Sequence, residues 1–110
     1  MTAEGEALSV VLMTVPDAPT GERIARALVE ERLIACANLL RGVTSIYRWQ
    51  GAVQAEGEEL VVMKTRAALL DRVFARAAEL HPYEVPELIA LPVQHGADSY
   101  CHWVRTETDG

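Results

Sequence analysis

The spacing of apolar positions along the chain predicts strands and helices in alternation. Residues 8–14 form an apolar run with several β-branched side chains, which is typical of a buried strand. A turn over 15–20 follows, in which Asp17 or Thr20 can cap a helix. The helix itself is indicated by an apolar stripe at helical spacing, formed by Ile24, Ala27 and Leu28.

The clearest helix is predicted over 67–80, where apolar side chains recur at i, i+3 and i+4. These side chains are Leu69, Leu70, Val73, Phe74, Ala77 and Leu80. Because a proline cannot continue a helix interior, Pro82 is expected to end this element.

A long hairpin is predicted between the two helices. Residues 34–40 have the composition of a second strand, and the alternation over 43–50 continues it beyond Gly42. We expect the hairpin tip over 51–57 and the returning strand over 59–65. A two-stranded ribbon of this length is marginally stable alone and exposes its edges, so it is predicted to pack against another subunit.

The last third of the chain predicts one more strand and a short helix. The strand is expected over 85–93, with prolines near both ends, and His95 and Gly96 are expected to form a turn. The helix is expected over 98–105, with an apolar face made by Tyr100, Trp103 and Val104. Residues 106–110 are expected to fray.

The predicted order is β-α-β twice, followed by a short helix. This order is that of the split βαβ, or ferredoxin-like, α+β fold, in which an antiparallel sheet carries its helices on one face. With 110 residues the chain is predicted to be a single domain over 1–110, with residues 1–6 and 106–110 flexible.

Composition narrows the function. Half of the residues are apolar but few are aromatic, and the formal net charge is −6. Nucleic-acid binding is disfavoured because basic residues are dispersed, and no stretch is long enough to span a membrane. The two cysteines, Cys36 and Cys101, do not form a disulfide framework, so reduced thiols in the cytoplasm are expected.

The tract over 81–87, HPYEVPE in one-letter code, contains an imidazole, a phenol, two carboxylates and two prolines. Prolines fix their own φ and keep the preceding residue extended, so this tract is predicted to be a stiff turn presenting polar groups, as a small-molecule or metal site requires. The alternative interpretation is a helix stop followed by a strand that begins on proline.

Three kinds of chemistry are open to these residues. His81, Cys36 and Glu84 are candidate ligands for copper or another divalent cation, with Glu87 as a further donor, although their spacing matches no metal motif. As a single residue, Cys36 is more typical of a small buried hydrophobe. Catalysis is not favoured, since a dyad of Cys36 and His81 would have no identifiable third group, and no enzyme is predicted.

Small-molecule binding is the third possibility. Ser45, Tyr47 and Trp49 share one face of the predicted hairpin, and Lys64 ends its returning strand. The alternatives are that the aromatic residues pack at a subunit contact and that Lys64 is a solvated strand end.

Together these tracts resemble one family. The matching pieces, in order, are Thr14-Val15-Pro16, residues 28–38 (LVEERLIACAN), residues 45–51 (SIYRWQG), Glu58, Lys64-Thr65, residues 81–87, Tyr100 and Trp103. The SIYRW and HPYEVPE tracts in combination are specific. On these residues the chain resembles the CutA divalent-cation tolerance family.

The resemblance implies a ferredoxin-like subunit in a homotrimer similar in architecture to PII-type signalling proteins, a link to copper and divalent-metal tolerance, no catalysed reaction and no organic cofactor. The positions that match the family's candidate site are Cys36, Trp49, Glu58, Lys64, His81, Tyr83 and Glu87. Some relatives have further cysteines near the first strand, where this chain has Met13 and Thr14.

The resulting hypothesis is a cytoplasmic homotrimer that binds divalent metal at His81, Cys36 and Glu84, with a ligand-binding cleft of Trp49, Glu58, Lys64, Tyr83 and Glu87 between subunits. The alternative is a PII-like regulatory trimer that binds a small anionic ligand in that cleft and signals to an unidentified protein partner.

Overall fold

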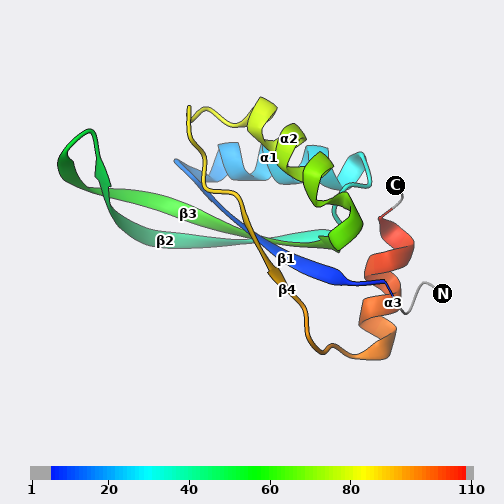
Figure 1. The fold of residues 1–110 in the computed structure, drawn as a ribbon. Coiled ribbons are helices and arrows are strands. Elements are labelled where there is room, and N and C mark those ends of the chain that lie inside the picture. The colour runs from blue at the N-terminus through cyan, green and yellow to red at the C-terminus, as the bar shows by residue number, and fades with distance from the viewer. Residues whose placement is uncertain (1–5, 109–110) are drawn as a thin grey trace.

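A computed structural model describes residues 6–108 as a four-stranded antiparallel sheet with two helices on one face and a third helix at one end (Figure 1). The elements are β1 (Leu8–Val15), α1 (Ala18–Glu30), β2 (Cys36–Trp49), β3 (Ala52–Arg66), the short 3₁₀ helix η2 (Ala67–Leu69), α2 (Leu70–Leu80), β4 (Ile89–Pro92) and α3 (Asp98–Glu107). The predicted ferredoxin-like α+β fold is confirmed.

The sheet has the strand order β2-β3-β1-β4, with every neighbouring pair antiparallel. The central strand β1 pairs with β3 on one side, from Leu8 opposite Arg66 to Val15 opposite Glu59, and with β4 on the other. Two split βαβ units therefore interleave, which places strands that are distant in sequence side by side.

The core fills the space between the sheet and helices α1 and α2. Alternate residues of the central strands point into it, because successive side chains of a strand face opposite sides. Its fully buried members are Val11, Met13, Val15, Ile24, Leu28, Val61, Met63, Val73 and Ala77. The helical stripe predicted from the sequence supplies the facing surface.

The start of α1 is set by two local features. Asp17 caps the helix by accepting a hydrogen bond from the Thr20 amide at 2.9 Å, which lowers the pKa of its carboxyl. Gly21 then faces the sheet, where a Cβ would lie 3.0 Å from Val15 Cγ2. Of the two predicted caps, Asp17 is the one used.

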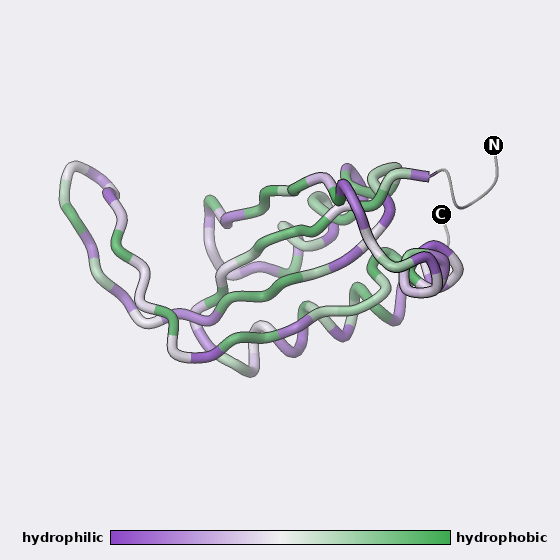
Figure 2. The backbone as a smooth tube through the Cα atoms, turned by 90° about the horizontal axis from the view of Figure 1, so that it is seen from below, coloured by the Kyte–Doolittle hydropathy of each residue, from purple (hydrophilic) through white to green (hydrophobic). Residues whose placement is uncertain are grey.

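The hairpin of β2 and β3 projects beyond the end of β1, as the ribbon and the hydropathy-coloured tube both show (Figures 1 and 2). Its register shifts once, between Leu40 and Val43, where Gly42 adopts a φ of 77°. An inserted residue at such a bulge bends the ribbon and increases its twist.

The predicted tip of the hairpin over 51–57 is wrong. The turn consists of Gln50 and Gly51, with φ values of 49° and 81°, and β3 begins at Ala52. Positive φ at both positions is the geometry that matches the twist of a two-residue hairpin. The acidic, glycine-containing run over 52–57 is therefore strand rather than loop.

The predicted strand over 85–93 is too long. Only Ile89–Pro92 pairs with β1, and residues 85–88 lie outside any strand. The chain has no assigned turn at His95 and Gly96, which belong to an extended connection to α3. Pro82 and Pro86 have no backbone N–H, so they cannot donate the hydrogen bonds that a longer strand paired with β1 would need.

The third helix differs from its prediction in length and in its buried face. It continues to Glu107, and its buried residues are Cys101 and Val104, whereas Tyr100 and Trp103 are partly exposed. A small apolar cluster joins Cys101 and Val104 to Leu8 and Ala35, so α3 packs over the end of the sheet where β1 begins.

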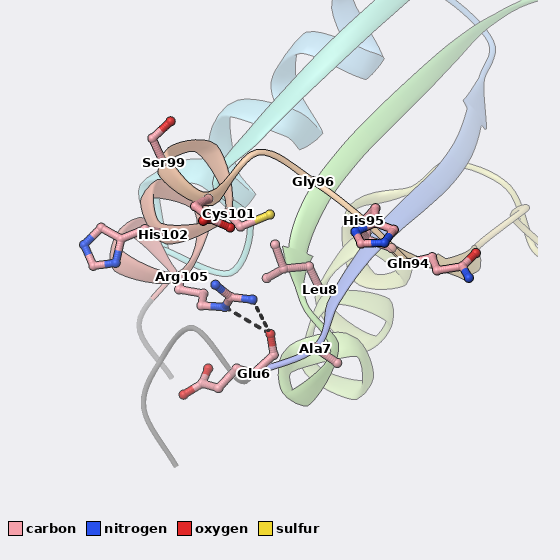
Figure 3. Close-up of a pocket in the computed structure, with 12 residues that line it drawn as sticks. Glu6, Ala7, Leu8, Gln94, His95, Gly96, Ser99, Cys101, His102 and Arg105 are labelled. Atoms are coloured by element: carbon pink, nitrogen blue, oxygen red, sulfur yellow. Dashed lines mark hydrogen bonds between the residues drawn. The ribbon is translucent and has the colours of Figure 1, made fainter.

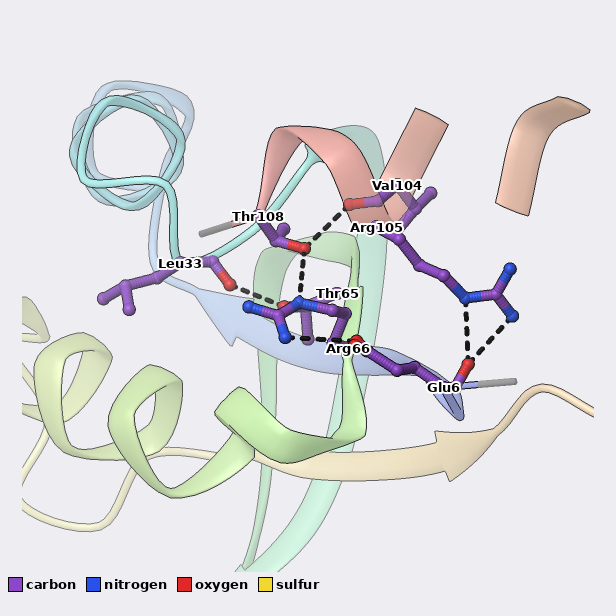
Figure 4. A network of polar contacts seen from close by, with 7 residues as sticks. All are labelled: Glu6, Leu33, Thr65, Arg66, Val104, Arg105 and Thr108. Carbon is purple, nitrogen blue, oxygen red and sulfur yellow. Dashed lines mark hydrogen bonds and ion pairs between the residues drawn. The ribbon is translucent and has the colours of Figure 1, made fainter. Parts of the chain in front are cut away.

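A polar network fastens the two ends of the described chain (Figure 4). Arg66 donates to the Thr108 hydroxyl at 3.1 Å and pairs with the Glu6 carboxylate at 3.1 Å, while Arg105 donates twice to the Glu6 carbonyl. Thr108 is only 2% exposed. Glu6 and residues 106–108 thus make hydrogen-bonded and packed contacts, while the rest of both ends predicted to be flexible lies outside the described residues. Within residues 6–108, no helix is long and apolar enough to cross a membrane.

Candidate functional site

A cavity of about 670 Å³ opens between the projecting hairpin and the segment that follows α2. It is lined by Thr14, Ser45, Ile46, Tyr47, Trp49, Glu56, Glu58, Pro82, Tyr83, Glu84, Val85 and Glu87. The SIYRW and HPYEVPE tracts, which are more than thirty residues apart in the sequence, thus meet at one site.

The position of the cavity follows from the strand order. β1 separates β3 from β4 and ends at Val15, opposite Glu59 of β3. Beyond that point β3 continues toward the hairpin tip, and the 82–87 segment precedes β4 on the other side, with no part of β1 between them. The end of the central strand therefore leaves an open slot between its two flanking segments.

His81 orients the 81–87 segment. It is 7% exposed, its Nε2 lies 2.8 Å from the Thr14 carbonyl oxygen, and its Nδ1 accepts a hydrogen bond from the Tyr83 amide at 3.1 Å. Because a carbonyl only accepts, Nε2 is the protonated nitrogen and the ring is the neutral tautomer. Both ring nitrogens are thus used within the fold, and His81 ties the segment to the end of β1.

Tyr83 bridges the slot. Its hydroxyl donates to Glu58 Oε2 at 2.7 Å, and its ring stacks in a tilted arrangement on His81 with centroids 4.7 Å apart. Burial and the adjacent Glu58 carboxylate, in that order, raise the pKa of Tyr83 well above its usual value, so the hydroxyl remains a donor.

A second pair of the same type lies on the hairpin. The Tyr47 hydroxyl donates to Glu56 Oε1 at 2.5 Å, and this hydrogen bond raises the pKa of Tyr47. Tyr47 and Trp49 lie on the same face of β2, as predicted, and Glu56 is opposite Ser45 on that face. Trp49 remains 43% exposed at the cavity mouth.

The charged side chains that line the cavity are all acidic. Its lining includes the carboxylates of Glu56, Glu58, Glu84 and Glu87, and among residues 6–108 no lysine or arginine belongs to it. Four carboxylates around one cavity produce a local negative potential that favours cations.

Most of the predicted ligand-binding residues line this cavity, but Lys64 does not. Trp49, Glu58, Tyr83 and Glu87 all line the cavity, together with Glu84. Lys64 does not line it, because it lies six positions after Glu58 along β3, a separation of about 20 Å. Its ammonium group instead donates to Asn38 Oδ1 on the neighbouring strand.

The predicted metal ligands are not assembled within one chain. Cys36 is opposite Lys64, away from the cavity, and its Sγ lies 3.4 Å from the Tyr100 hydroxyl. His81 has no ring nitrogen left for a metal, and within residues 6–108 there is no group of three or more histidine, cysteine, aspartate or glutamate side chains placed to hold an ion. A copper site formed by His81, Cys36 and Glu84 of one chain does not fit this arrangement.

The matched sequence spans nearly the whole described chain: residues 9–107 match the family model described as CutA1 divalent ion tolerance protein. The chain belongs to this CutA1 family. It is 48% identical over 99 residues to the divalent-cation tolerance protein CutA of Thermus thermophilus, covering 90% of this chain and 96% of that protein. It is 42% identical to the chloroplastic CutA protein of Arabidopsis thaliana, of which the match spans only 54%.

Solved structures of CutA1 proteins have the same fold. The CutA1 structure from Oryza sativa superimposes with a TM-score of 0.93 at 40% identity, covering 96% of this chain and 97% of that one. The divalent cation tolerance protein of Thermus thermophilus gives a TM-score of 0.91 at 47% identity, with coverages of 93% and 99%. The family identified from the SIYRW and HPYEVPE tracts is therefore confirmed.

Thr14 and Glu56 line this cavity but were not among the site residues predicted from the sequence. Glu56 fell in the supposed hairpin tip, and its role depends on being opposite Ser45 in the strand register. If β3 had been predicted to begin directly after Gly51, the alternation of side chains along a strand would have placed Glu56 and Glu58 on the same face as Tyr47. Thr14 contributes because it lies at the end of β1; the sequence predicts where this strand ends but not which residues lie beside that end.

A second cavity, of about 730 Å³, lies at the other end of the molecule, between the start of β1 and α3 (Figure 3). Its lining includes His95, Cys101, His102 and Arg105. The Cys101 sulfur packs against Gly96, where a Cβ would lie 2.6 Å from it. None of the predicted site residues belongs to this cavity.

Proposed function

We propose that this CutA1-family chain forms a homotrimer and serves tolerance of divalent cations by binding the ions at the acidic cavity. The names of its relatives describe tolerance to divalent cations rather than a reaction, which supports a binding protein and not an enzyme. We expect it to act in the cytoplasm, where the free thiols of Cys36 and Cys101 would stay reduced.

The observation that supports this proposal is that all charged side chains lining the cavity are carboxylates. Carboxylate oxygens are suitable donors for divalent cations, and Glu58 and Glu56 already accept hydrogen bonds that fix one oxygen each. The second oxygen of each carboxylate remains for an ion. Weak binding through carboxylates is a better match to these residues than the predicted copper site at His81 and Cys36.

The exposed apolar face of the sheet supports self-association. Opposite the helices, the half-exposed side chains include Leu40, Ile89 and Leu91, and register places Ile89 beside Leu12 and Leu91 beside Val10. On the projecting hairpin Ile46 is 72% exposed. A closed assembly of identical copies would cover both surfaces and the free hairpin edges.

The regulatory alternative, a PII-like trimer with an anionic ligand, gains no support from the charge of this cavity. Four carboxylates repel an anion unless a basic group from another subunit enters the site. Lys64, which the sequence interpretation placed in the cleft, would have to come from a neighbouring copy.

The proposal is tested by light scattering and by calorimetric titration of the purified, metal-free protein with Cu(II). We expect a mass three times that of the subunit, and at least about fivefold weaker Cu(II) binding in Glu58→Gln, which keeps the acceptor for Tyr83 but removes the charge. The matched control is Glu30→Gln, an exposed glutamate at the end of α1. Equal loss in both variants would indicate a general charge effect and contradict the proposed site.

A further inference from the structure

We propose that the same cavity also binds small organic cations, compounds with primary ammonium or guanidinium groups on an aliphatic chain, and that Trp49 distinguishes them from bare metal ions. This inference rests on the proposed function only in using the same cavity. Three observations support it: the size of the cavity, its aromatic surfaces and its supply of hydrogen-bond acceptors.

The size of the cavity fits a small organic molecule better than a single ion. Its volume of about 670 Å³ lies within the range of about 300–1,000 Å³ that ligand pockets occupy. A metal ion bound by two carboxylates would leave most of that space to water. Organic ligands instead fill such a pocket with apolar surface.

Aromatic and aliphatic surface is available for that purpose. Trp49 and Tyr47 present exposed rings from β2, and Ile46 and Val85 contribute aliphatic side chains from opposite sides. An indole is the strongest of the aromatic partners for a cationic head group. Trp49 makes no hydrogen bond in the part of the chain that the structure describes, and its side chain is 43% exposed in the single subunit.

The phenol and carboxylate groups of the cavity act as acceptors, while the Thr14 and Ser45 hydroxyls and the Trp49 N–H can also donate. The hydroxyl protons of Tyr47 and Tyr83 are already donated to Glu56 and Glu58 at 2.5 and 2.7 Å. Their oxygens and the carboxylates can therefore only accept from a ligand. A ligand with several N–H donors and positive charge satisfies these acceptors, whereas the four carboxylates repel an anion.

The spread of the carboxylates favours a ligand with two cationic ends. Glu56 and Glu58 come from β3, while Glu84 and Glu87 come from the segment on the other side of the slot. Tyr83 spans the gap between these two sides and forms part of its lining. A chain with an amine at each end can reach a carboxylate on each side while its methylene groups contact Trp49 and Val85.

The test is calorimetric titration of the native assembly with 1,5-diaminopentane, with pentane-1,5-diol and glutarate as neutral and anionic probes of equal length. We expect the diamine to bind, with no heat of binding from the diol or glutarate. Trp49→Leu should weaken diamine binding at least about fivefold, and should weaken it more than Cu(II) binding, because the indole contacts the organic cation and is no ligand for a metal ion. Glu58→Gln should weaken both, and Glu30→Gln neither.

The outcomes separate this inference from the proposed function. Cu(II) binding without diamine binding, or diamine binding that survives Trp49→Leu, would overturn the inference and leave cation tolerance standing. Diamine binding without Cu(II) binding would support the inference and overturn the proposed metal role. Binding of glutarate would overturn the inference by indicating that a basic group from another subunit dominates the site.

Discussion

The two halves of β3 differ although they belong to one continuous strand. Residues 59–66 lie between β1 and β2 and bury Val61 and Met63 completely, whereas residues 52–58 pair with β2 alone and remain largely exposed. The first half contributes to the core and the second half supplies Glu56 and Glu58 to the cavity. Core packing and cavity lining therefore fall on different segments of the same element.

The difference arises because β1 is shorter than the hairpin. A strand paired on both sides and covered by helices can be apolar on alternate positions. The projecting part of the hairpin has neither a third strand nor a helix packed on it, so its side chains need not be apolar and polar ones can line a cavity. The test with the largest expected effect is whether other copies of the chain cover the exposed apolar side chains of the sheet and the hairpin.

We predict that Ile89→Asp dissociates the assembly. A carboxylate placed at this position would be desolvated when the apolar sheet face is covered, which costs several kcal/mol unless the charge is paired. Light scattering on a sizing column should then report the subunit mass. Val29→Asp, on the outer surface of α1, is the matched control and should stay assembled. An unchanged mass for Ile89→Asp would show that this face is not the interface.

The contrast within β3 is tested by the same substitution in its two halves. Val61→Ala should lower the free energy of unfolding by about 2–3 kcal/mol, since Val61 is fully buried. Val53→Ala, at a side chain 64% exposed in the subunit, should cost less. Urea denaturation measures both. If Val53→Ala lowered the free energy of unfolding as much as Val61→Ala, the projecting part of the hairpin would be packed as tightly as the core.

The sequence was sufficient for the central half of the molecule and insufficient for the projecting half. The apolar, β-branched run over 8–14 and the helical stripe of α2 identified core elements because both depend on local composition and spacing. The hairpin tip was misplaced because Gln50 takes a positive φ, which is unusual for a residue other than glycine. That error removed Glu56 from the candidate site.

The contacts of single residues were hidden from the sequence for a similar reason. His81 carries the chemistry of a metal ligand, but its two nitrogens are used by Thr14 and Tyr83, contacts that a sequence does not reveal. Lys64 and Glu58 share one strand, and only a known strand geometry shows how far apart they lie. The sequence thus indicated that the two motif tracts carry polar groups of interest, but not which of those groups lie together or what each contacts.

His81→Ala should destabilise the fold by about 1–3 kcal/mol, because it leaves the Thr14 carbonyl and the Tyr83 amide without their partner. The control is His95→Ala, at an exposed position in the connection before α3. Thermal denaturation of both variants distinguishes the two roles of His81. Unaltered stability combined with lost Cu(II) binding would restore the predicted metal ligand.

A smaller effect is expected at alkaline pH. The hydrogen bond to Cys36 and then burial raise the pKa of Tyr100 from 10.0 to about 12. Between these values the unfolded chain releases the phenol proton while the folded chain retains it, so stability is full below pH 10 and falls as pH rises toward 12. Tyr100→Phe should show a shallower decline in this window, measured by urea denaturation at stepped pH. An identical decline would contradict the assignment to Tyr100.

The most direct test of the central claim is the location of a bound cation. Crystals of the protein soaked in a Cu(II) salt should give an anomalous scattering peak inside the cavity, within ligand distance of the Glu56 or Glu58 carboxylate. A peak only beside His95 or His102 in the second cavity, or none at all at saturating Cu(II), would contradict the account.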